Sequence, residues 1–488
     1  MKRLLLACGT SFFLLTGCSD VLERTPQGQI TVENFWQNGE QAEQSVNAIY
    51  NQLRDFQVHV LPYIGVTDII SDDAEKGSVP GDANFLQEID DFTHTPSNPG
   101  PTGVWSGYYT GIFRTNLAIE RIPDVPEMDE DLRARLIGEA RFLRGYFYFN
   151  LTRWFGDVVL STTAIPEDLL QSRSSRDEVY ELIIEDFTFA AANLPKKSQY
   201  GPADLGRATS GAAKAFLAKV HLTRGDWSAA LASAEEVIDG SEYSLLPSYQ
   251  SIFTEAGENA SESIFEVQSA AFETGGGGTQ YNEAQGVRGV PNLGWGFNRP
   301  SDALISAFEI GDPRREATIL YEGEILPDGS GLIEQNPNIV NARFNQKAYV
   351  GDHPGGNGNG PGNIRILRYA DVILIAAEAS NELGMTEQAL GYVNQIRARA
   401  RGNSSRFLRD ITTTDQQALR TAIWQERRVE FGMEQIRWFD LVRTGRAASV
   451  MQALGKDFVE GKHELLPIPQ GDIDLSLGAL SQNPGYVN

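Results

Sequence analysis

The side chains that most often carry catalysis are scattered along this chain and form no recognised catalytic motif. The five histidines lack the paired spacing of a zinc hydrolase; they are His59, His94, His221, His353 and His463. The sequence also lacks the GxSxG motif of a serine nucleophile and the GxxxxGKS/T motif of a nucleotide-binding loop. Glycoside hydrolysis needs only two carboxylates across a cleft. Because the chain has 65 acidic residues, meeting this requirement does not indicate a glycoside hydrolase. We therefore assign no catalytic residue and expect no enzymatic activity, cofactor or bound metal.

The two cysteines indicate membrane attachment. A basic start and a short apolar run at residues 4–15 lead into Leu15-Thr16-Gly17-Cys18, the pattern of a bacterial lipoprotein signal. Residues 1–17 are expected to be a signal peptide, Cys18 to be lipidated, and residues 18–36 to form a lipid-anchored tether. Cys8 would leave with the signal, so no disulfide is expected. The alternative is a chance cysteine in an ordinary secreted precursor.

The charge balance excludes some partners. The chain has 41 Lys and Arg against 65 Asp and Glu, a formal net charge of −24 at pH 7. Nucleic acids and anionic lipid surfaces are bound by basic faces, so neither is an expected partner. The composition, 41% hydrophobic and 22% charged, is that of a globular protein.

Two dense groups of charged residues have structural as well as functional interpretations. Asp68, Asp72, Asp73 and Glu75 offer oxygens that could hold calcium, but they lack the spacing of a calcium-binding loop, which favours a solvated acidic loop. A second group, between residues 426 and 443, alternates Arg with Glu and Asp around two aromatic residues. We expect interlocked ion pairs that fasten helices there, in preference to a catalytic centre.

Helical periodicity dominates the rest of the chain. Apolar stripes predict helices near residues 46–53, 132–154, 179–190 and 417–428. Two helical pairs, 210–224 with 226–239 and 369–383 with 386–400, also match each other at a fixed offset. The matched positions are Ala218, Gly225, Ala230, Leu231 and Val237 with Ala377, Gly384, Ala389, Leu390 and Ile396. Small residues and a glycine at each turn are typical of tetratricopeptide-type hairpins. The sequence therefore predicts a mostly α fold.

Two stretches lack this periodicity. The middle of the chain, about residues 244–365, is rich in glycine and reads as a large irregular insertion in the helical scaffold. Residues 59–103 form a second loop-like stretch. We expect one domain at residues 37–488, with both stretches on one face, because binding surfaces commonly form on loops carried by a rigid scaffold.

Ordered motifs along nearly the whole mature chain resemble the RagB/SusD family of outer-membrane nutrient-binding lipoproteins. The motifs are Phe35-Trp36, Glu139-Ala140-Arg141-Phe142-Leu143-Arg144, Arg173-Ser174-Ser175-Arg176, Arg207-Ala208-Thr209-Ser210, Leu367-Arg368-Tyr369-Ala370-Asp371-Val372, Glu426-Arg427-Arg428, Arg437-Trp438-Phe439-Asp440-Leu441, Leu465-Leu466-Pro467-Ile468-Pro469 and Gln482-Asn483-Pro484-Gly485-Tyr486. One departure is Gln435-Ile436, where the family more often has Gly and a polar or aromatic residue.

The resemblance implies a SusD-like fold of tetratricopeptide-like helical pairs with an irregular insertion. It also implies a lipid-anchored protein of the cell outer membrane, facing the exterior, that binds a nutrient and delivers it to a SusC-like TonB-dependent transporter. The nutrient is usually an oligosaccharide, and family members are binders and not enzymes. Two alternatives remain: a secreted glycoside hydrolase, and a tetratricopeptide-type assembly lipoprotein that binds only proteins.

Aromatic residues on the two irregular stretches are the candidate sugar contacts. The apolar face of a sugar ring stacks on an aromatic ring, and its hydroxyls need polar partners. The candidate contacts are Trp295, Tyr281, Tyr63 and Phe85, with Asp72, Asp73 and Asn84 for the hydroxyls. Trp295 stands between two glycines, so its ring could be exposed. The alternative is that Trp295 packs the insertion against the helical core.

Overall fold

The computed structural model describes residues 35–166, 170–339, 343–354, 358–404 and 406–487. The expected signal peptide, Cys18 and nearly all of the expected tether lie outside these described residues. Among the described residues, no helix is both long enough and apolar enough to cross a membrane.

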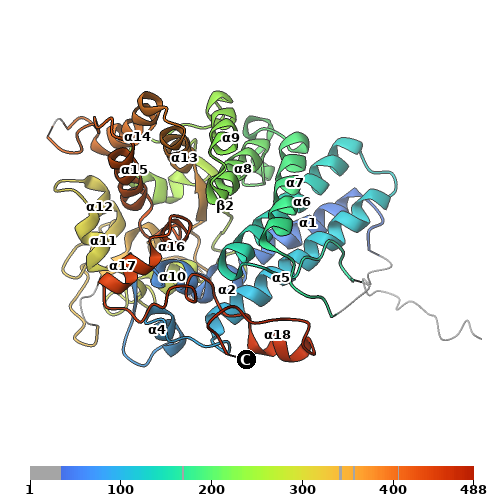
Figure 1. The fold of residues 1–488 in the computed structure, drawn as a ribbon, viewed down its shortest axis with the longest axis horizontal. Helices are drawn as coiled ribbons and strands as arrows, with labels where there is room; N and C mark the ends of the chain where they lie inside the picture. The colour runs from blue at the N-terminus through green and yellow to red at the C-terminus, as the bar shows by residue number, and fades with distance from the viewer. Residues whose placement is uncertain (1–34, 167–169, 340–342, 355–357, 405, 488) are drawn as a thin grey trace, which may run out of the picture.

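Long helices packed in sequence order form an arc across the molecule (Figure 1). The arc confirms the expected mostly α, tetratricopeptide-like fold. Its helices are α1 (Gly39–Gln52), α5 (Pro99–Arg121), α6 (Glu130–Phe155), α7 (Arg176–Asn193), α8 (Ser210–Arg224), α9 (Trp227–Asp239), α13 (Tyr369–Glu382), α14 (Thr386–Arg401) and α15 (Gln416–Phe431).

The two helical pairs predicted to match each other are α8–α9 and α13–α14, and α9 packs against α13 across the intervening insertion. Gly225 and Gly384 have φ angles of 77° and 76°, the left-handed conformation that ends the first helix of each pair. The matched alanines, among them Ala218 and Ala377, are fully buried and let the paired helices approach closely. The repeat read from the sequence is therefore a structural repeat.

Helix α6 is the centre of the N-terminal half, packed between α5 and α7. Its start is capped by Asp129, whose side chain accepts a hydrogen bond from the Leu132 N–H. Arg144, deep in this helix, donates two hydrogen bonds of 2.7 and 2.8 Å to Asp186 of α7. Such a buried bidentate pair fixes the register of two helices, since shifting either helix would leave an unpaired buried charge.

Short elements replace long helices in the two irregular stretches. The N-terminal stretch contains α2 (Phe56–His59), α3 (Leu61–Ile64), a π-helical turn (Gly65–Ile69), β1 (Ala74–Gly77) and α4 (Asn84–Asp90). The insertion contains β2 (Ser263–Val267), α10 (Tyr281–Gln285), β3 (Phe297–Pro300), α11 (Asp302–Ala307), α12 (Pro313–Thr318), β4 (Ile319–Tyr321), β5 (Arg343–Asn345) and β6 (Ile364–Arg368). The chain ends with α16 (Arg437–Arg443), α17 (Ala447–Ala453) and α18 (Gln470–Leu475).

Three two-stranded antiparallel sheets hold the insertion together. Strand β1 pairs with β3, with Glu75 opposite Arg299, so the two irregular stretches lie side by side. Strand β2 pairs with β6 and closes the base of the insertion, while β4 pairs with β5 within it. The two stretches, which we expected on one face, are therefore joined directly by a strand pairing.

A buried ionic network fastens the insertion to the helices. Arg368, at the end of β6, contacts Glu262 at 2.6 Å, Glu430 at 3.1 Å and Glu434 at 2.7 Å. Arg314 of α12 also reaches Glu430 at the end of α15, at 3.1 Å. These charges are nearly inaccessible to water, so each depends on its partners.

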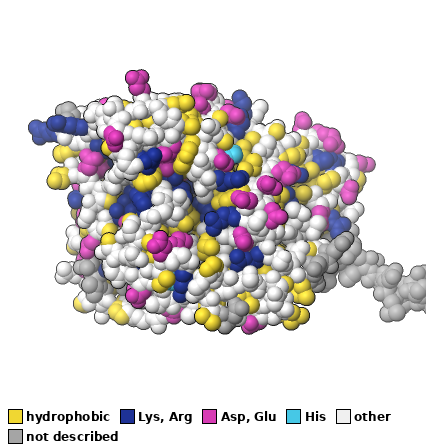
Figure 2. Space-filling view, in the orientation of Figure 1, with side chains coloured by type: hydrophobic (Ala, Val, Ile, Leu, Met, Phe, Trp, Pro, Cys, Tyr) yellow, Lys and Arg dark blue, Asp and Glu magenta, His cyan; other side chains and the backbone are white. Residues whose placement is uncertain are grey.

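The predicted interlocking of the charged group at residues 426–443 is confirmed. Arg427 binds Asp371 and Asp440, at 2.8 and 3.0 Å, and Arg443 binds Asp440 and Glu378, both at 2.7 Å. Figure 2 shows acidic side chains spread over one face, with Lys and Arg gathered mostly toward its centre, around α16. The ion pairs of Arg427 and Arg443 fasten α15 and α16 to α13.

Candidate ligand-binding site

A cleft of about 540 Å³ opens where the two irregular stretches meet, and we call it the Trp295 cleft. One wall comes from the N-terminal stretch and the other from the insertion. The lining residues are Phe56, Leu61, Asp82, Ala83, Arg288, Asn292, Gly294, Trp295 and Phe297. The β1–β3 pairing places these two segments next to each other, so the cleft depends on that small sheet.

The backbone around Trp295 is held on both sides. The Trp295 N–H donates to the Glu283 carbonyl oxygen at 2.7 Å, and the next residue, Gly296, donates to Gly286 at 3.0 Å. The Gly296 carbonyl accepts from the Ser78 N–H at 2.6 Å. Gly296 has a φ of 73°, which only glycine adopts without strain. The position of the indole is therefore set by the fold.

The Trp295 side chain is half-buried. It packs against the hydrophobic core and at the same time lines the cleft. The two interpretations offered by the sequence, a packing residue and an exposed ring, are therefore compatible with each other.

A polar group sits beside the indole. The Arg288 guanidinium donates from Nη1 to Asp82 Oδ2 at 2.5 Å and to Ser78 Oγ at 2.6 Å. Both Arg288 and Asp82 keep part of their side chains exposed. The cleft thus offers an aromatic surface with a paired donor and acceptor beside it, the combination that hydroxyl-rich rings require. Sequence reasoning missed Arg288 and Asp82, because neither stands in a motif.

Phe85 and Asn84, two predicted contacts, begin α4 directly after Ala83 of the cleft wall. The Asn84 side chain is exposed, whereas Phe85 is half-buried and packs against the core. Neither lines the cleft, but both lie one or two residues from its wall.

Tyr63 and Tyr281, predicted as loop aromatics, lie instead in short helices and are buried. The Tyr63 ring meets His59 and Trp154 edge-on, with centroids 4.7 and 6.1 Å apart. The Tyr281 hydroxyl donates to Gln435 Oε1 at 3.1 Å, and burial raises the pKa of this phenol. Both rings belong to the core, which corrects the expectation that they face a ligand.

Asp72 and Asp73, predicted to bind sugar hydroxyls, are also buried. Arg437 donates to both Asp72 carboxylate oxygens, at 2.7 and 3.0 Å, and Arg428 donates to Asp73 at 2.8 Å. The carboxylates are therefore committed to the arginines at the end of the chain. The expected solvated acidic loop is wrong as well, since these residues and Asp68 are inaccessible.

Asp68 sits at the centre of this buried region. It accepts hydrogen bonds from the Gln435 N–H at 3.0 Å, from Gln435 Nε2 at 2.6 Å and from Asn298 Nδ2 at 3.0 Å. Burial nevertheless raises the pKa of Asp68 to about 6. In the described part of the chain, no group of three or more His, Cys, Asp or Glu side chains is arranged to hold a metal ion. The carboxylates of Asp68, Asp72 and Asp73 are instead held by amide and guanidinium donors.

Comparisons with known proteins agree along the chain. A model of the SusD family matches residues 261–486, and a model described as "Starch-binding associating with outer membrane" matches residues 41–222. SusD-like protein P2 from Formosa agariphila is 29% identical over 521 residues, which cover 100% of both chains.

Solved structures extend this agreement to three dimensions. A laminarin-binding SusD-like protein is 30% identical, with a TM-score of 0.78 over 92% of this chain and 100% of its own. Surface glycan-binding protein A from Bacteroides thetaiotaomicron, solved in complex with laminarihexaose, is 26% identical, with a TM-score of 0.77 over 91% of this chain and 99% of its own. Together with the two family models, these similarities show that the chain belongs to the RagB/SusD family.

Proposed function

We propose that this protein captures a neutral oligosaccharide in the Trp295 cleft and delivers it to a SusC-like TonB-dependent transporter. It would act from the cell outer membrane, facing the exterior and anchored through lipidated Cys18. The observation that carries the binding proposal is the half-exposed Trp295 indole beside the Arg288–Asp82 pair in an open cleft.

The cleft suits a binder better than an enzyme. Glycoside hydrolysis needs two carboxyl groups that flank the scissile bond. Among the residues that line the Trp295 cleft, Asp82 is the one acid, and it is paired with Arg288. The proposal is therefore of capture without turnover, in line with relatives that are described as binding laminarin or a glycan.

Calorimetric titration tests the site. Laminarihexaose is the first probe, because a relative of known structure binds it, and a glycan array supplies the probe if laminarihexaose gives no heat. Trp295→Ala is expected to weaken binding about tenfold, since an aromatic–sugar contact contributes roughly 1–2 kcal/mol.

Trp227→Ala is the matched control. Trp227 is also half-buried against the core, but it starts α9 and does not line the cleft. Its replacement should leave the affinity unchanged. Equal affinity of the Trp295→Ala protein and the wild type would contradict the proposed site. New reducing ends after incubation would favour the hydrolase alternative, and binding of proteins but of no glycan would favour the assembly alternative.

A further inference from the structure

The turn at residues 78–83 forms part of one wall of the Trp295 cleft, and we call it the 78–83 turn. It follows strand β1 and leads into α4. Asp82 and Ala83 line the cleft, and the Asp82 carboxylate accepts a hydrogen bond from Arg288, which belongs to the insertion. The conformation of this turn therefore decides where the polar group of the cleft lies relative to the Trp295 indole.

The backbone of the 78–83 turn is strained at both of its ends. Ser78 has a φ of 56° and Ala83 a φ of 43°, in the left-handed region that residues with a Cβ rarely adopt. Such conformations persist only where surrounding contacts hold them, and they are concentrated at functional sites. The turn therefore needs contacts that offset the free-energy cost of these two residues.

Lys76 supplies such contacts from the preceding strand, β1. The residue is only 6% exposed, and its Nζ donates to the Val79 carbonyl oxygen at 3.0 Å and to the Asp82 carbonyl oxygen at 2.8 Å. Hydrogen bonds from a charged donor are stronger than those between neutral groups. Because both acceptors are backbone carbonyls of one turn, the ammonium fixes the path of the chain between them.

The other contacts of the turn hold mainly its first residues. The Ser78 N–H donates to the Gly296 carbonyl oxygen at 2.6 Å, and a Cβ added at Gly77 would lie 2.5 Å from that oxygen, so the two backbones approach too closely for a side chain. Farther along, the Asp82 N–H donates to the Val79 carbonyl oxygen at 3.2 Å, the long end of the usual range. The Lys76 ammonium is therefore the stronger restraint on the part of the turn that carries Asp82.

We infer that Lys76 is a positioning residue for ligand binding in the Trp295 cleft: its ammonium holds the 78–83 turn so that Asp82, and Arg288 through Asp82, face a bound sugar. Lys76 does not line the cleft itself, so it acts through Asp82. The inference rests on the proposed function for the ligand. A polar group that is held in place before the ligand arrives loses little conformational freedom on binding, which favours affinity.

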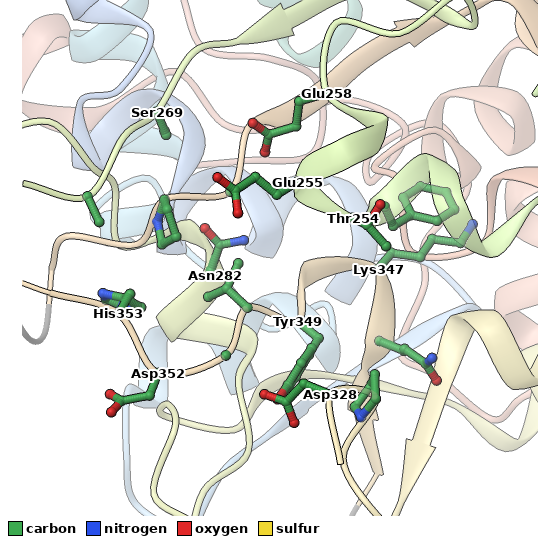
Figure 3. Close-up of a pocket in the computed structure, with 18 of the residues that line it drawn as sticks. Thr254, Glu255, Glu258, Ser269, Asn282, Asp328, Lys347, Tyr349, Asp352 and His353 are labelled. Atoms are coloured by element: carbon green, nitrogen blue, oxygen red, sulfur yellow. The ribbon is translucent and has the colours of Figure 1, made fainter. Parts of the chain in front are cut away.

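A larger cavity of about 580 Å³ inside the insertion is the alternative place for a ligand (Figure 3). Its lining includes the exposed carboxylates of Glu255, Asp328 and Asp352, and in Figure 3 the first lies above the other two. The cavity shares no lining residue with the Trp295 cleft, and neither Lys76 nor the 78–83 turn belongs to its wall. A ligand held there would bind wild type and Lys76 variants alike.

Calorimetric titration with laminarihexaose, or with the glycan that an array supplies, tests the inference. Lys76→Met removes the ammonium and leaves an unbranched side chain in its space. This variant should bind several-fold to about tenfold more weakly, as expected when a charge-assisted hydrogen bond to the ligand is no longer held in place. Lys76→Gln keeps one donor group and should show a smaller loss, and it replaces Lys76→Met if that variant does not fold.

Lys197→Met is the matched control. The Lys197 Nζ also donates to two backbone carbonyl oxygens, those of Ala260 at 2.6 Å and Ser263 at 2.8 Å, but none of these three residues lines the cleft. Both lysine-to-methionine variants should lower the melting temperature, whereas only the variant at Lys76 should lose affinity. Equal losses of affinity would reveal a general effect of destabilisation and would overturn the inference.

A double-mutant cycle with Asp82→Ala shows whether Lys76 acts through Asp82. Asp82→Ala alone should weaken binding at least as much as Lys76→Met does, and the double variant should bind about as well as Asp82→Ala alone. If the two losses instead multiply in the double variant, Lys76 acts independently of Asp82 and the assignment is wrong.

Hydrogen–deuterium exchange of the free protein separates this inference from the proposed function. The Ser78 and Asp82 N–H groups are hydrogen-bonded, and they should exchange faster in Lys76→Met than in the wild type. If Trp295→Ala weakens binding and Lys76→Met does not, the inference is wrong and the proposed function stands. If no glycan binds but exchange in the turn is faster, the proposed function is wrong and Lys76 still holds the turn. Unchanged exchange would overturn the role of Lys76.

Discussion

Several side chains of this protein are buried by partners that lie far away in the sequence. Asp72 and Asp73 look like exposed loop carboxylates until Arg428 and Arg437, from the other end of the chain, are placed beside them. Tyr63 becomes a core residue through its contact with Trp154. Local sequence carries no information about such contacts, because burial is decided by the tertiary fold. Trp295 lines the cleft, and its contact with a ligand stays a prediction that rests on its flanking glycines, a local signal.

Gln435 shows how a departure from a family pattern is accommodated. The residue has a φ of 59°, where the family more often has glycine, and a non-glycine residue there costs roughly 1 kcal/mol. Its side chain compensates, because it donates to buried Asp68 at 2.6 Å and accepts from the Tyr281 hydroxyl at 3.1 Å.

Gln435→Gly is therefore expected to destabilise the protein by about 1–3 kcal/mol, since two buried polar groups lose a partner while only the backbone strain is relieved. Urea unfolding measures the change. Leu477→Gly is the control: Leu477 also has a positive φ, 53°, but is 82% exposed, so its replacement should be neutral or slightly stabilising. A Gln435→Gly protein at least as stable as the wild type would show that the side-chain contacts do not matter.

Among the elements, most of the long helices were predicted from the sequence, but the 23-residue helix α5 (Pro99–Arg121) was not, and neither were the short helices. The boundaries of α8, α9, α13 and α14 match their periodicity to within about one residue, because each helix buries one regular face. Helices α2 and α3 span only four residues each, too few for a periodic pattern, so the stretch at residues 59–103 read as loop. The pairing of β1 with β3 agreed with the expectation that the two irregular stretches share a face.

The ionic network between the insertion and α15 gives the fold an acid-sensitive element. Burial alone would raise the pKa of Glu430, but the nearby Arg399 and Arg368 outweigh burial and lower this pKa to about 2. The pKa of Asp371 is also lowered to about 2, because Lys219 and Arg427 outweigh the effect of its burial. Carboxylates with lowered pKa values stabilise the folded state above their unfolded pKa values, near 4, and this contribution is lost as the pH falls toward 2. Asp68, with its raised pKa, acts in the opposite direction between pH 4 and 6.

The melting temperature is therefore expected to change little between pH 6 and 4.5 and to fall steeply between pH 4 and 2. Differential scanning calorimetry across this range measures it. The fall should persist in 1 M salt, because buried pairs are screened far less than surface pairs. A melting temperature that stays constant down to pH 2, or an acid effect abolished by salt, would contradict the assignment of the network as a fastening element.

At the scale of the whole molecule, the proposed function depends on attachment to the outer membrane. The described residues contain no helix that could span a bilayer, and the predicted lipid anchor, Cys18, precedes them. Cys18→Ala is therefore expected to move the protein from the membrane fraction to the soluble fraction, because no other thiol would remain to carry acyl chains. Fractionation and immunoblotting after a high-salt wash measure this. A variant that still sediments with membranes would exclude the lipid anchor.

The family and its fold followed from ordered motifs spread over the whole chain, whereas the position of the ligand did not. The central claim of this account is that an oligosaccharide lies across the Trp295 cleft. A crystal structure of the protein with laminarihexaose, or with the best hexasaccharide from a glycan array, tests this most directly. We expect a sugar ring stacked on the Trp295 indole with a hydroxyl bound by Arg288 or Asp82. Sugar density on another surface, with the Trp295 cleft empty at saturating ligand, would contradict the account.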